Sequence, residues 1–223
     1  MTVILMLAMF AIFLTIDYLR KGKEARETAA AHEEAEAIVP RALPTIVAGF
    51  ELPANRSYHQ GHTWAQQESP TLVRVGIDDF GARLAGNIDQ ISLPKRGQWL
   101  RQGQKFAILL RDGQKTELVS PVEGEVTSVN ESLLENASML NNDPYGQGWF
   151  VSVLAPDLAI NFRNLLNGSL ARKWMAEASS RLQLRIPALA GAVAQDGGVA
   201  VRDLTVQMPT ARWTEITREF FLT

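Results

Sequence analysis

The dipeptide Asp112-Gly113 lies between two short apolar runs and constrains the middle of the chain to a β-hairpin. Phe106–Leu110 precedes the dipeptide and Thr116–Val119 follows it. Asp-Gly favours a two-residue hairpin turn because both central residues of that turn need positive φ. Short apolar runs bounded by Gly, Pro, Asn or Asp recur from Tyr58 to about Leu166. We therefore predict a small, mainly β sandwich or barrel in this part of the chain.

Further elements of this β domain follow from hydrophobic periodicity. Thr71–Ile77 alternates apolar and other residues, which is typical of a strand with one buried face. The valine-rich stretch around Gly124 and the run Trp149–Val153 add predicted strands. Apolar residues at helical spacing predict a short helix over Asp78–Ala85. The paired polar residues at the start of that helix suit capping, so we assign them no acid–base role.

The N-terminus contains an apolar run that the mean hydropathy of -0.05 conceals. Val3–Leu14 has no polar side chain, and a basic edge follows at Arg20, Lys21 and Lys23. We predict an uncleaved membrane anchor over residues 1–20, because no positive charge precedes the run as it would in a signal peptide. The basic edge places the rest of the chain in the cytoplasm. A cleaved signal peptide and a helix buried in a partner are the alternatives.

Residues 21–56 separate the predicted anchor from the β domain. Glu24–Ala37 is rich in Ala and Glu and predicts a solvated helix that ends before Pro40. Three prolines then indicate an irregular linker, in which Ile46, Val47 and Phe50 could pack on the following domain. The β domain itself is assigned to residues 57–167.

Composition excludes several classes of site. The chain has no Cys and three His among 223 residues, so disulfides, thiol catalysis and Cys- or His-rich metal centres are not expected. A net charge of -2 argues against nucleic-acid binding. Because the chain contains no nucleophile-elbow, P-loop or dinucleotide-binding pattern, we predict neither an enzyme nor a small-molecule substrate. No metal site and no cofactor are predicted.

Residues 168–223 form a mostly helical extension. Ser169 could cap a helix running to about Leu184, and Ala211–Phe221 predicts a final helix. A turn is expected at Asp196–Gly198 between them. The extension could fold back on the β domain or dock on a partner. In the second case Trp213, Phe220 and Phe221 are the candidate interface residues, because aromatic side chains are enriched at interfaces.

The β domain resembles the lipoyl-carrying H protein of the glycine cleavage system, over about half of the chain. That resemblance implies a barrel-sandwich hybrid of the biotinyl- and lipoyl-carrier type. The residues that carry it run from Tyr58 to Trp149: Tyr58, His62, Trp64, Val75-Gly76-Ile77, Asp79-Phe80, Gly86-Asn87-Ile88, Leu93-Pro94, Gly97, Gly103, Phe106, Ser120-Pro-Val-Glu-Gly-Glu-Val126, Val129-Asn-Glu131 and Asn142-Asp-Pro-Tyr-Gly-Gln-Gly-Trp149.

The same resemblance implies a lipoyl-lysine at the tip of the hairpin, seven residues before Ser120. That position is Gly113, and the glutamate that the family places three residues earlier corresponds to Leu110. Lys115 is the remaining candidate, because a shift of two residues keeps the same strand face but moves the amine away from the tip. We expect lipoate to be absent and Lys115 to be an exposed strand lysine, near Glu117.

We therefore expect a single-pass protein of a bacterial-type cytoplasmic membrane whose non-lipoylated, H-protein-like domain lies in the cytoplasm. Its expected role is that of a structural or adaptor subunit, with other subunits of a membrane complex as partners. Two alternatives remain open. One is a lipoyl carrier of glycine cleavage type that uses Lys115, and the other is an accessory subunit of a membrane redox enzyme.

Overall fold

A computed structural model describes residues 45–186, 203–205 and 210–223, with the side chains of residues 210 and 211 excepted. The predicted anchor over residues 1–20, residues 21–44 of the segment that follows it and the expected turn at Asp196–Gly198 lie outside the described residues. None of the helices formed by the described residues is long and apolar enough to cross a membrane. The described residues belong to one compact unit.

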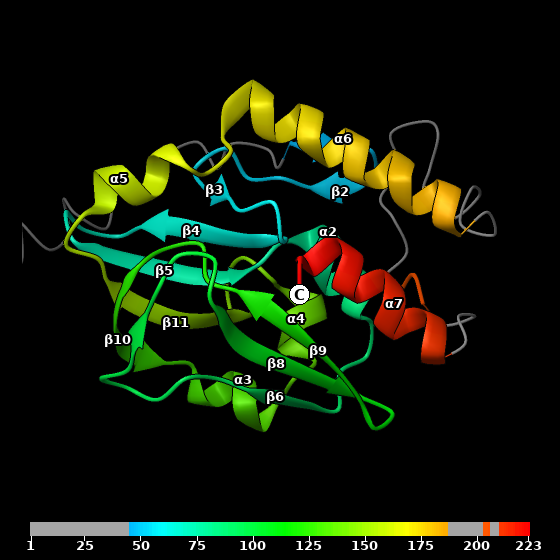
Figure 1. Cartoon of the computed structure of the whole chain (residues 1–223), viewed down its shortest axis with the longest axis horizontal. Coiled ribbons are helices and arrows are strands. Elements are labelled where there is room, and N and C mark those ends of the chain that lie inside the picture. Colours follow the sequence, from blue (N-terminus) through cyan, green and yellow to red (C-terminus); the bar gives the residue numbers. More distant parts are fainter. Residues whose placement is uncertain (1–44, 187–202, 206–209) are drawn as a thin grey trace, which may run out of the picture. The chain divides into compact units, whose positions relative to one another are not determined.

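Antiparallel strands dominate this unit (Figure 1). Six of them form one sheet in the order β3-β4-β5-β11-β10-β7, three form a second in the order β6-β8-β9, and β1 pairs with β2. The predicted mainly β architecture is confirmed. The strands are β1 Ile46–Val47, β2 Phe50–Glu51, β3 Ser57–Tyr58, β4 Thr63–Gln67, β5 Leu72–Ile77, β6 Gln90–Ser92, β7 Trp99–Leu100, β8 Lys105–Arg111, β9 Gln114–Val119, β10 Gly124–Val129 and β11 Trp149–Leu154.

Six helices accompany the strands in the described part of the chain. Two of them, α6 and α7, belong to the C-terminal extension, and the others are short connections within or beside the sheets. The bounds are α2 Asp79–Ala85, α3 Glu131–Glu135, α4 Met139–Asn142, α5 Leu158–Arg163, α6 Gly168–Arg185 and α7 Thr210–Phe221.

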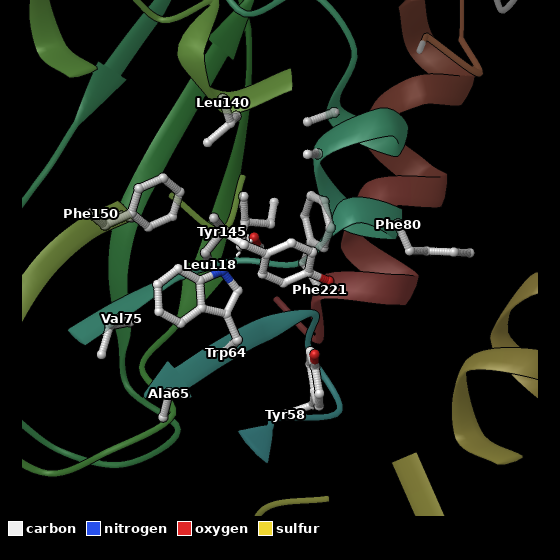
Figure 2. Packing of buried hydrophobic residues seen from close by; sticks show 14 of the residues in the cluster. Tyr58, Trp64, Ala65, Val75, Phe80, Leu118, Leu140, Tyr145, Phe150 and Phe221 are labelled. Atoms are coloured by element: carbon white, nitrogen blue, oxygen red, sulfur yellow. Dashed lines mark hydrogen bonds between the residues drawn. The ribbon is translucent and has the colours of Figure 1, made fainter. Parts of the chain in front are cut away.

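One hydrophobic cluster joins both large sheets to the extension. Trp64 of β4 is fully buried, and Phe150 and Leu118 come to the same cluster from β11 and β9 (Figure 2). Phe221, at the end of α7, is part of it as well. The indole nitrogen of Trp64 donates to the carbonyl oxygen of Ile77 at 2.8 Å, which satisfies its buried polar atom. The β domain and the C-terminal helices therefore share a core.

The predicted hairpin and the predicted short helix are both confirmed. β8 and β9 pair from Lys105 to the turn, where Arg111 lies opposite Gln114. Asp112 and Gly113 both have positive φ, as the expected two-residue turn requires. The side chain of Asp78 accepts a hydrogen bond from the backbone nitrogen of Gly81 at 2.7 Å and caps α2.

The C-terminal helices match their predicted ranges but differ in detail. Asn167, rather than Ser169, is the N-cap residue of α6, and its side chain makes no capping hydrogen bond. The buried face of α6 consists of Ala171, Met175, Ala178, Ser179 and Leu182. Leu170 is apolar and lies at helical spacing from this face, yet 58% of it is exposed. A helix whose apolar residues are loosely spaced has two similar faces, and packing selects one of them.

The end of the predicted linker takes part in the fold. Phe50 of β2 is fully buried and its ring lies 4.9 Å from that of Phe80 on α2. Leu52 is buried in the same core. The pairing of β1 with β2 thus brings residues 46–51 into the compact unit. Val47 and Phe50 pack on the core as expected, whereas Ile46 is 38% exposed.

Candidate functional site

The turn between β8 and β9 is the position at which the resemblance places a carrier lysine. Gly113 occupies it with φ of +73°, next to Asp112 with φ of +48°, and both residues are exposed. A Cβ atom added at Gly113 would meet nothing within 4 Å. Space would therefore allow a side chain, whereas the positive φ favours glycine. The turn offers no amine for acylation.

Lys115 lies on β9, beyond the turn, opposite Leu110 of β8. It is exposed. The nearby carboxylate of Glu117 accepts a hydrogen bond from the Lys105 side chain at 2.7 Å. That bond is the main reason why the pKa of Glu117 is lowered, and Lys115 contributes a smaller attraction. Lys115 is thus a strand lysine. That it carries no lipoate stays a prediction.

The end of the hairpin is tied to two other segments. The Arg111 guanidinium donates to the carbonyl oxygen of Ala85 at 3.3 Å and to the hydroxyl of Thr205, and it lies 3.6 Å from the Asp203 carboxylate. On the other side, the carboxylate of Asp89 accepts from the backbone nitrogen of Asp112 at 2.7 Å. These bonds connect the turn to the C-terminal end of α2, to the residue before β6 and to the extension.

Helix α7 covers the same end of the domain, where it packs on β9 and α2. The indole nitrogen of Trp213 donates to the carbonyl oxygens of Leu84 and Ala85 at 3.3 and 3.2 Å. Thr214 donates to the side-chain oxygen of Gln114, beside the turn, at 2.9 Å. These contacts fix α7 against the hairpin.

The three aromatic interface candidates are buried in the chain's own fold. Trp213 and Phe220 are each 2% exposed, and Phe221 is fully buried. The Phe220 ring lies 5.2 Å from that of Phe80. The structure therefore places these side chains as in the fold-back alternative, and in this arrangement none of them can reach a partner. Their sequence spacing alone could not separate the two cases, because core packing and docking both need an apolar stripe.

A buried imidazole–carboxylate pair joins α2 to the C-terminal helices. His62 and Asp78 are both fully buried, and Nδ1 of the imidazole lies 2.9 Å from Oδ2 of the carboxylate. The His62 ring stacks on Phe80 at 4.2 Å, with Trp174 of α6 at 4.7 Å. The sequence indicated that Asp78, at the start of α2, is a capping residue. It did not reveal the contact between His62 and Asp78, because the two residues are 16 positions apart in the chain.

Other titratable groups near this pair are held in structural bonds. Burial raises the pKa of Asp79, although a hydrogen bond from Arg83 at 2.7 Å opposes the shift. The hydroxyl of Tyr145 donates to the Glu51 carbonyl oxygen at 2.7 Å and accepts from the Asp79 nitrogen at 3.1 Å. Burial also raises the pKa of Tyr145 well above its usual value. We assign this network a structural role.

His59 and His62 do not form a metal centre with neighbouring ligands. Within residues 45–186, 203–205 and 210–223, no group of three or more His, Cys, Asp or Glu side chains could hold a metal ion. The Nδ1 atom of His59 accepts a hydrogen bond from the backbone nitrogen of Gly61 at 3.0 Å. Burial lowers the pKa of His59, and the nearby His62 lowers it further.

Comparison with known proteins identifies the family. The family model described as "Glycine cleavage H-protein" matches residues 56–178, which is more than half of the chain. The chain belongs to the glycine cleavage H-protein family. The match begins before β3 and ends within α6, so α7 lies beyond it.

Individual H proteins are similar in sequence to about half of the chain. A probable glycine cleavage system H protein of Natronomonas pharaonis is 37% identical over 106 residues, which cover 48% of this chain and 83% of the relative. The H protein of Myxococcus xanthus is 33% identical over 106 residues, with 48% and 81% covered. A crystal structure of the H protein from Mycobacterium marinum aligns with a TM-score of 0.49 and 25% identity, covering 56% of this chain and 98% of that one.

The residues at the hairpin turn do not fit the prosthetic group that an H protein normally carries. An amide-linked lipoyl arm needs a lysine amine at the turn, and Gly113 has no side chain. The flanks of the turn are also bonded to Thr205, Asp89 and Thr214 through Arg111, Asp112 and Gln114. The turn therefore supplies no side-chain amine for attaching lipoate.

Proposed function

We propose that this H-protein-family chain does not carry lipoate and serves as a structural or adaptor subunit of a complex at the cytoplasmic membrane. The observation that carries the proposal is Gly113, which stands with positive φ at the hairpin turn in place of a lysine. An H protein acts as a carrier and not as a catalyst. Without a lipoyl group, such a domain can still offer its rigid surface to a partner.

The contacts of the turn support the same proposal. A swinging arm works only if its base is free to enter the sites of partner enzymes. Here α7 packs along β9, and the segment 203–205 bonds Arg111. The C-terminal extension thus occupies the surroundings of the turn, which suits a fixed structural element better than a delivery device.

The membrane location in this proposal comes from the N-terminal sequence. The apolar run Val3–Leu14 with the basic residues after it predicts an anchor whose following domain is cytoplasmic. A reporter fused after residue 25 tests the orientation. We expect reporter activity on the cytoplasmic side, and activity only on the extracytoplasmic side would overturn the orientation.

Intact-mass spectrometry tests the absence of lipoate directly. The full chain would be produced together with a lipoyl ligase and supplied with lipoate. We expect no lipoyl mass increment on the wild-type chain. The matched control is the double variant Leu110→Glu/Gly113→Lys, which restores both family features and is expected to gain the increment.

One alternative function has an observation in its favour. Lys115 is exposed and lies close to the turn, so it is the residue through which the chain could still act as a lipoyl carrier of glycine cleavage type. A lipoyl increment on the wild-type chain that disappears in Lys115→Ala would establish this alternative and overturn the proposal.

Affinity purification from gently solubilised native membranes tests the adaptor role. We expect the full chain to be recovered with other subunits in several mild detergents. Recovery of monomer alone in all of them would contradict the proposed role in an assembly.

A further inference from the structure

Three large apolar side chains are exposed at the end of the domain that carries α5. The exposed fractions are 48% for Trp99 on β7, 42% for Leu154 on β11 and 55% for Ile160 on α5. Glu125 of β10 pairs with Trp99 on one side and with Leu154 on the other. Paired residues of neighbouring antiparallel strands point to the same face, so Trp99, Glu125 and Leu154 form one outward row.

Two hollows flank Ile160. One, of about 170 Å³, lies between Trp99 and Ile160, with Glu123 and Asp157 at its edge. The other, of about 570 Å³, runs from Ile160 past Leu158 and other apolar residues of the same segment. Exposed apolar residues around concave surface of this kind are typical of protein–protein contact sites.

The floor of the smaller hollow is held in place by hydrogen bonds. The side-chain oxygen of Asn161, which is buried, accepts from the backbone nitrogen of Glu123 at 2.9 Å. Gln102 donates to the carbonyl oxygens of Asn161 and Pro121 at 2.9 and 2.8 Å. The backbone of α5 is thereby joined to the loop before β10. A surface fixed in this way loses little conformational freedom when a partner binds.

The charges of this surface have one sign. Glu123 and Asp157 are the charged residues that line the two hollows, and Glu125 lies between Trp99 and Leu154. All three carboxylates are exposed. Among the described residues, none of the three takes part in an ion pair. The surface therefore presents unpaired negative charge beside apolar groups.

We propose that this face, the Trp99 surface (Trp99, Glu123, Glu125, Leu154, Asp157 and Ile160), docks a basic amphipathic segment of a partner protein. Aliphatic side chains of the segment cover Trp99 and Ile160, and its Lys or Arg side chains pair with the carboxylates. An anionic membrane is disfavoured as the occupant, because its headgroups would repel the same carboxylates. This inference deepens the proposed adaptor function and rests on it.

The Trp99 surface does not include the hairpin turn or the contacts of Arg111 with Asp203 and Thr205. In Figure 1, α5 and β10 lie at one side of the domain, and α7 and the β8–β9 turn lie at the other. A partner on the Trp99 surface can therefore bind without displacing α7. Docking there would not depend on the residue at position 113.

Site-specific photo-crosslinking tests the proposal on the full chain in its native host. A benzoylphenylalanine residue replaces Ile160 in one strain and Leu134 of α3 in another. Leu134 is a matched control, because it is 43% exposed and lies outside both hollows. We expect an adduct from position 160 and none from position 134. Peptide sequencing of the adduct is expected to place Lys or Arg beside aliphatic residues.

Variants that change the charge or the side-chain size of this surface test which residues bind the partner. Glu123→Lys/Glu125→Lys should lower its yield about tenfold, whereas Glu131→Lys/Glu135→Lys, on exposed glutamates of α3, should leave it unchanged. Trp99→Ala should weaken binding about thirtyfold if Trp99 is the central anchor. Melting curves of each variant verify that the fold is retained.

Each other outcome overturns the inference. These outcomes are no adduct from position 160, equal adducts from positions 160 and 134, an acidic or uncharged cross-linked peptide, a lipid, or a second copy of this chain. A failure of the proposed adaptor function would give different experimental results. Lipoate on the wild-type chain, or monomer alone from membranes, refutes the adaptor role, whereas retained subunits with no adduct at position 160 refute only the Trp99 surface.

Discussion

The two ends of the described domain treat their apolar side chains in opposite ways. At the hairpin end, Trp213 is 2% exposed under contacts with α2, and the turn is bonded to the C-terminal extension. At the α5 end, Trp99 is 48% exposed and borders a hollow with unpaired carboxylates. A tryptophan is buried in the fold at one end and half exposed at the other.

The two ends differ because the C-terminal extension packs on one of them. At the end where the resemblance places a carrier lysine, Gly113 stands at the turn, and α7, a helix beyond the family match, packs on β9 beside it. The opposite end has two hollows beside exposed apolar side chains. Binding to a partner is thus expected at the end that the extension leaves open.

The largest expected effect is at the covered end. Trp213→Ala removes a buried indole with its two hydrogen bonds and should lower the free energy of unfolding by about 3–5 kcal/mol. Trp99→Ala is the matched control and should cost less than about 1 kcal/mol, because half of that side chain is already in water. Urea denaturation of both variants measures the difference. Equal losses would contradict the contrast between the two ends.

The contacts that tie the hairpin to Asp203 and Thr205 should contribute less to the free energy of unfolding. Asp203→Ala removes the carboxylate that accepts from the backbone nitrogen and the hydroxyl of Thr205, at 2.8 and 2.6 Å. Because Thr205 is buried, its unpaired groups should cost about 1–3 kcal/mol. Asp112→Asn, at an exposed turn position that tolerates Asn, should change stability by less than about 0.5 kcal/mol. An Asp203→Ala variant as stable as the wild type would show that the contacts of Asp203 and Thr205 do not stabilise the hairpin.

The turn glycine should show a conformational effect without a steric one. Gly113→Ala places a Cβ atom in open space but at φ of +73°, so we expect a loss of about 1–2 kcal/mol. Gly113→Asn should lose less, since Asn tolerates positive φ. Thermal melting of the two variants makes the comparison. No loss in Gly113→Ala would mean that the turn readjusts and that a lysine could be accommodated there without cost.

The smallest effect concerns pH. Burial lowers the folded-state pKa of His59 below its usual 6.5, so the unfolded chain binds this proton more readily. The free energy of unfolding should therefore fall as the pH drops below about 6.5. His59→Gln should remove that part of the pH dependence. Denaturation curves at several pH values test this, and identical pH profiles for both chains would contradict it.

The strands and the turn were predictable because they rest on local rules. Alternation placed Val73, Val75 and Ile77 on one face, and all three are fully buried. Asp112-Gly113 predicted its turn, because few dipeptides adopt positive φ at both positions. The family match over residues 56–178 agrees with the residues on which the resemblance was based.

The contacts between distant residues were not predictable from one sequence. Arg111 and Thr205 are 94 positions apart, and no periodic pattern links them. The Trp99 surface was missed for a similar reason. Trp99 and Ile160 are separated by 60 residues, and each by itself resembles an ordinary core residue. Leu170 shows the reverse case, because it is apolar and the packing of α6 nevertheless leaves it exposed to solvent.

The sequence by itself determined the mainly β fold, the hairpin and the absence of a lysine at position 113, since these follow from local backbone preferences and residue identity. Only the tertiary structure decided that α7 buries Trp213, Phe220 and Phe221 against its own domain, while Trp99 and Ile160 remain exposed. An apolar side chain gains free energy from any contact that removes it from water. Which contact it makes depends on the geometry of the whole fold.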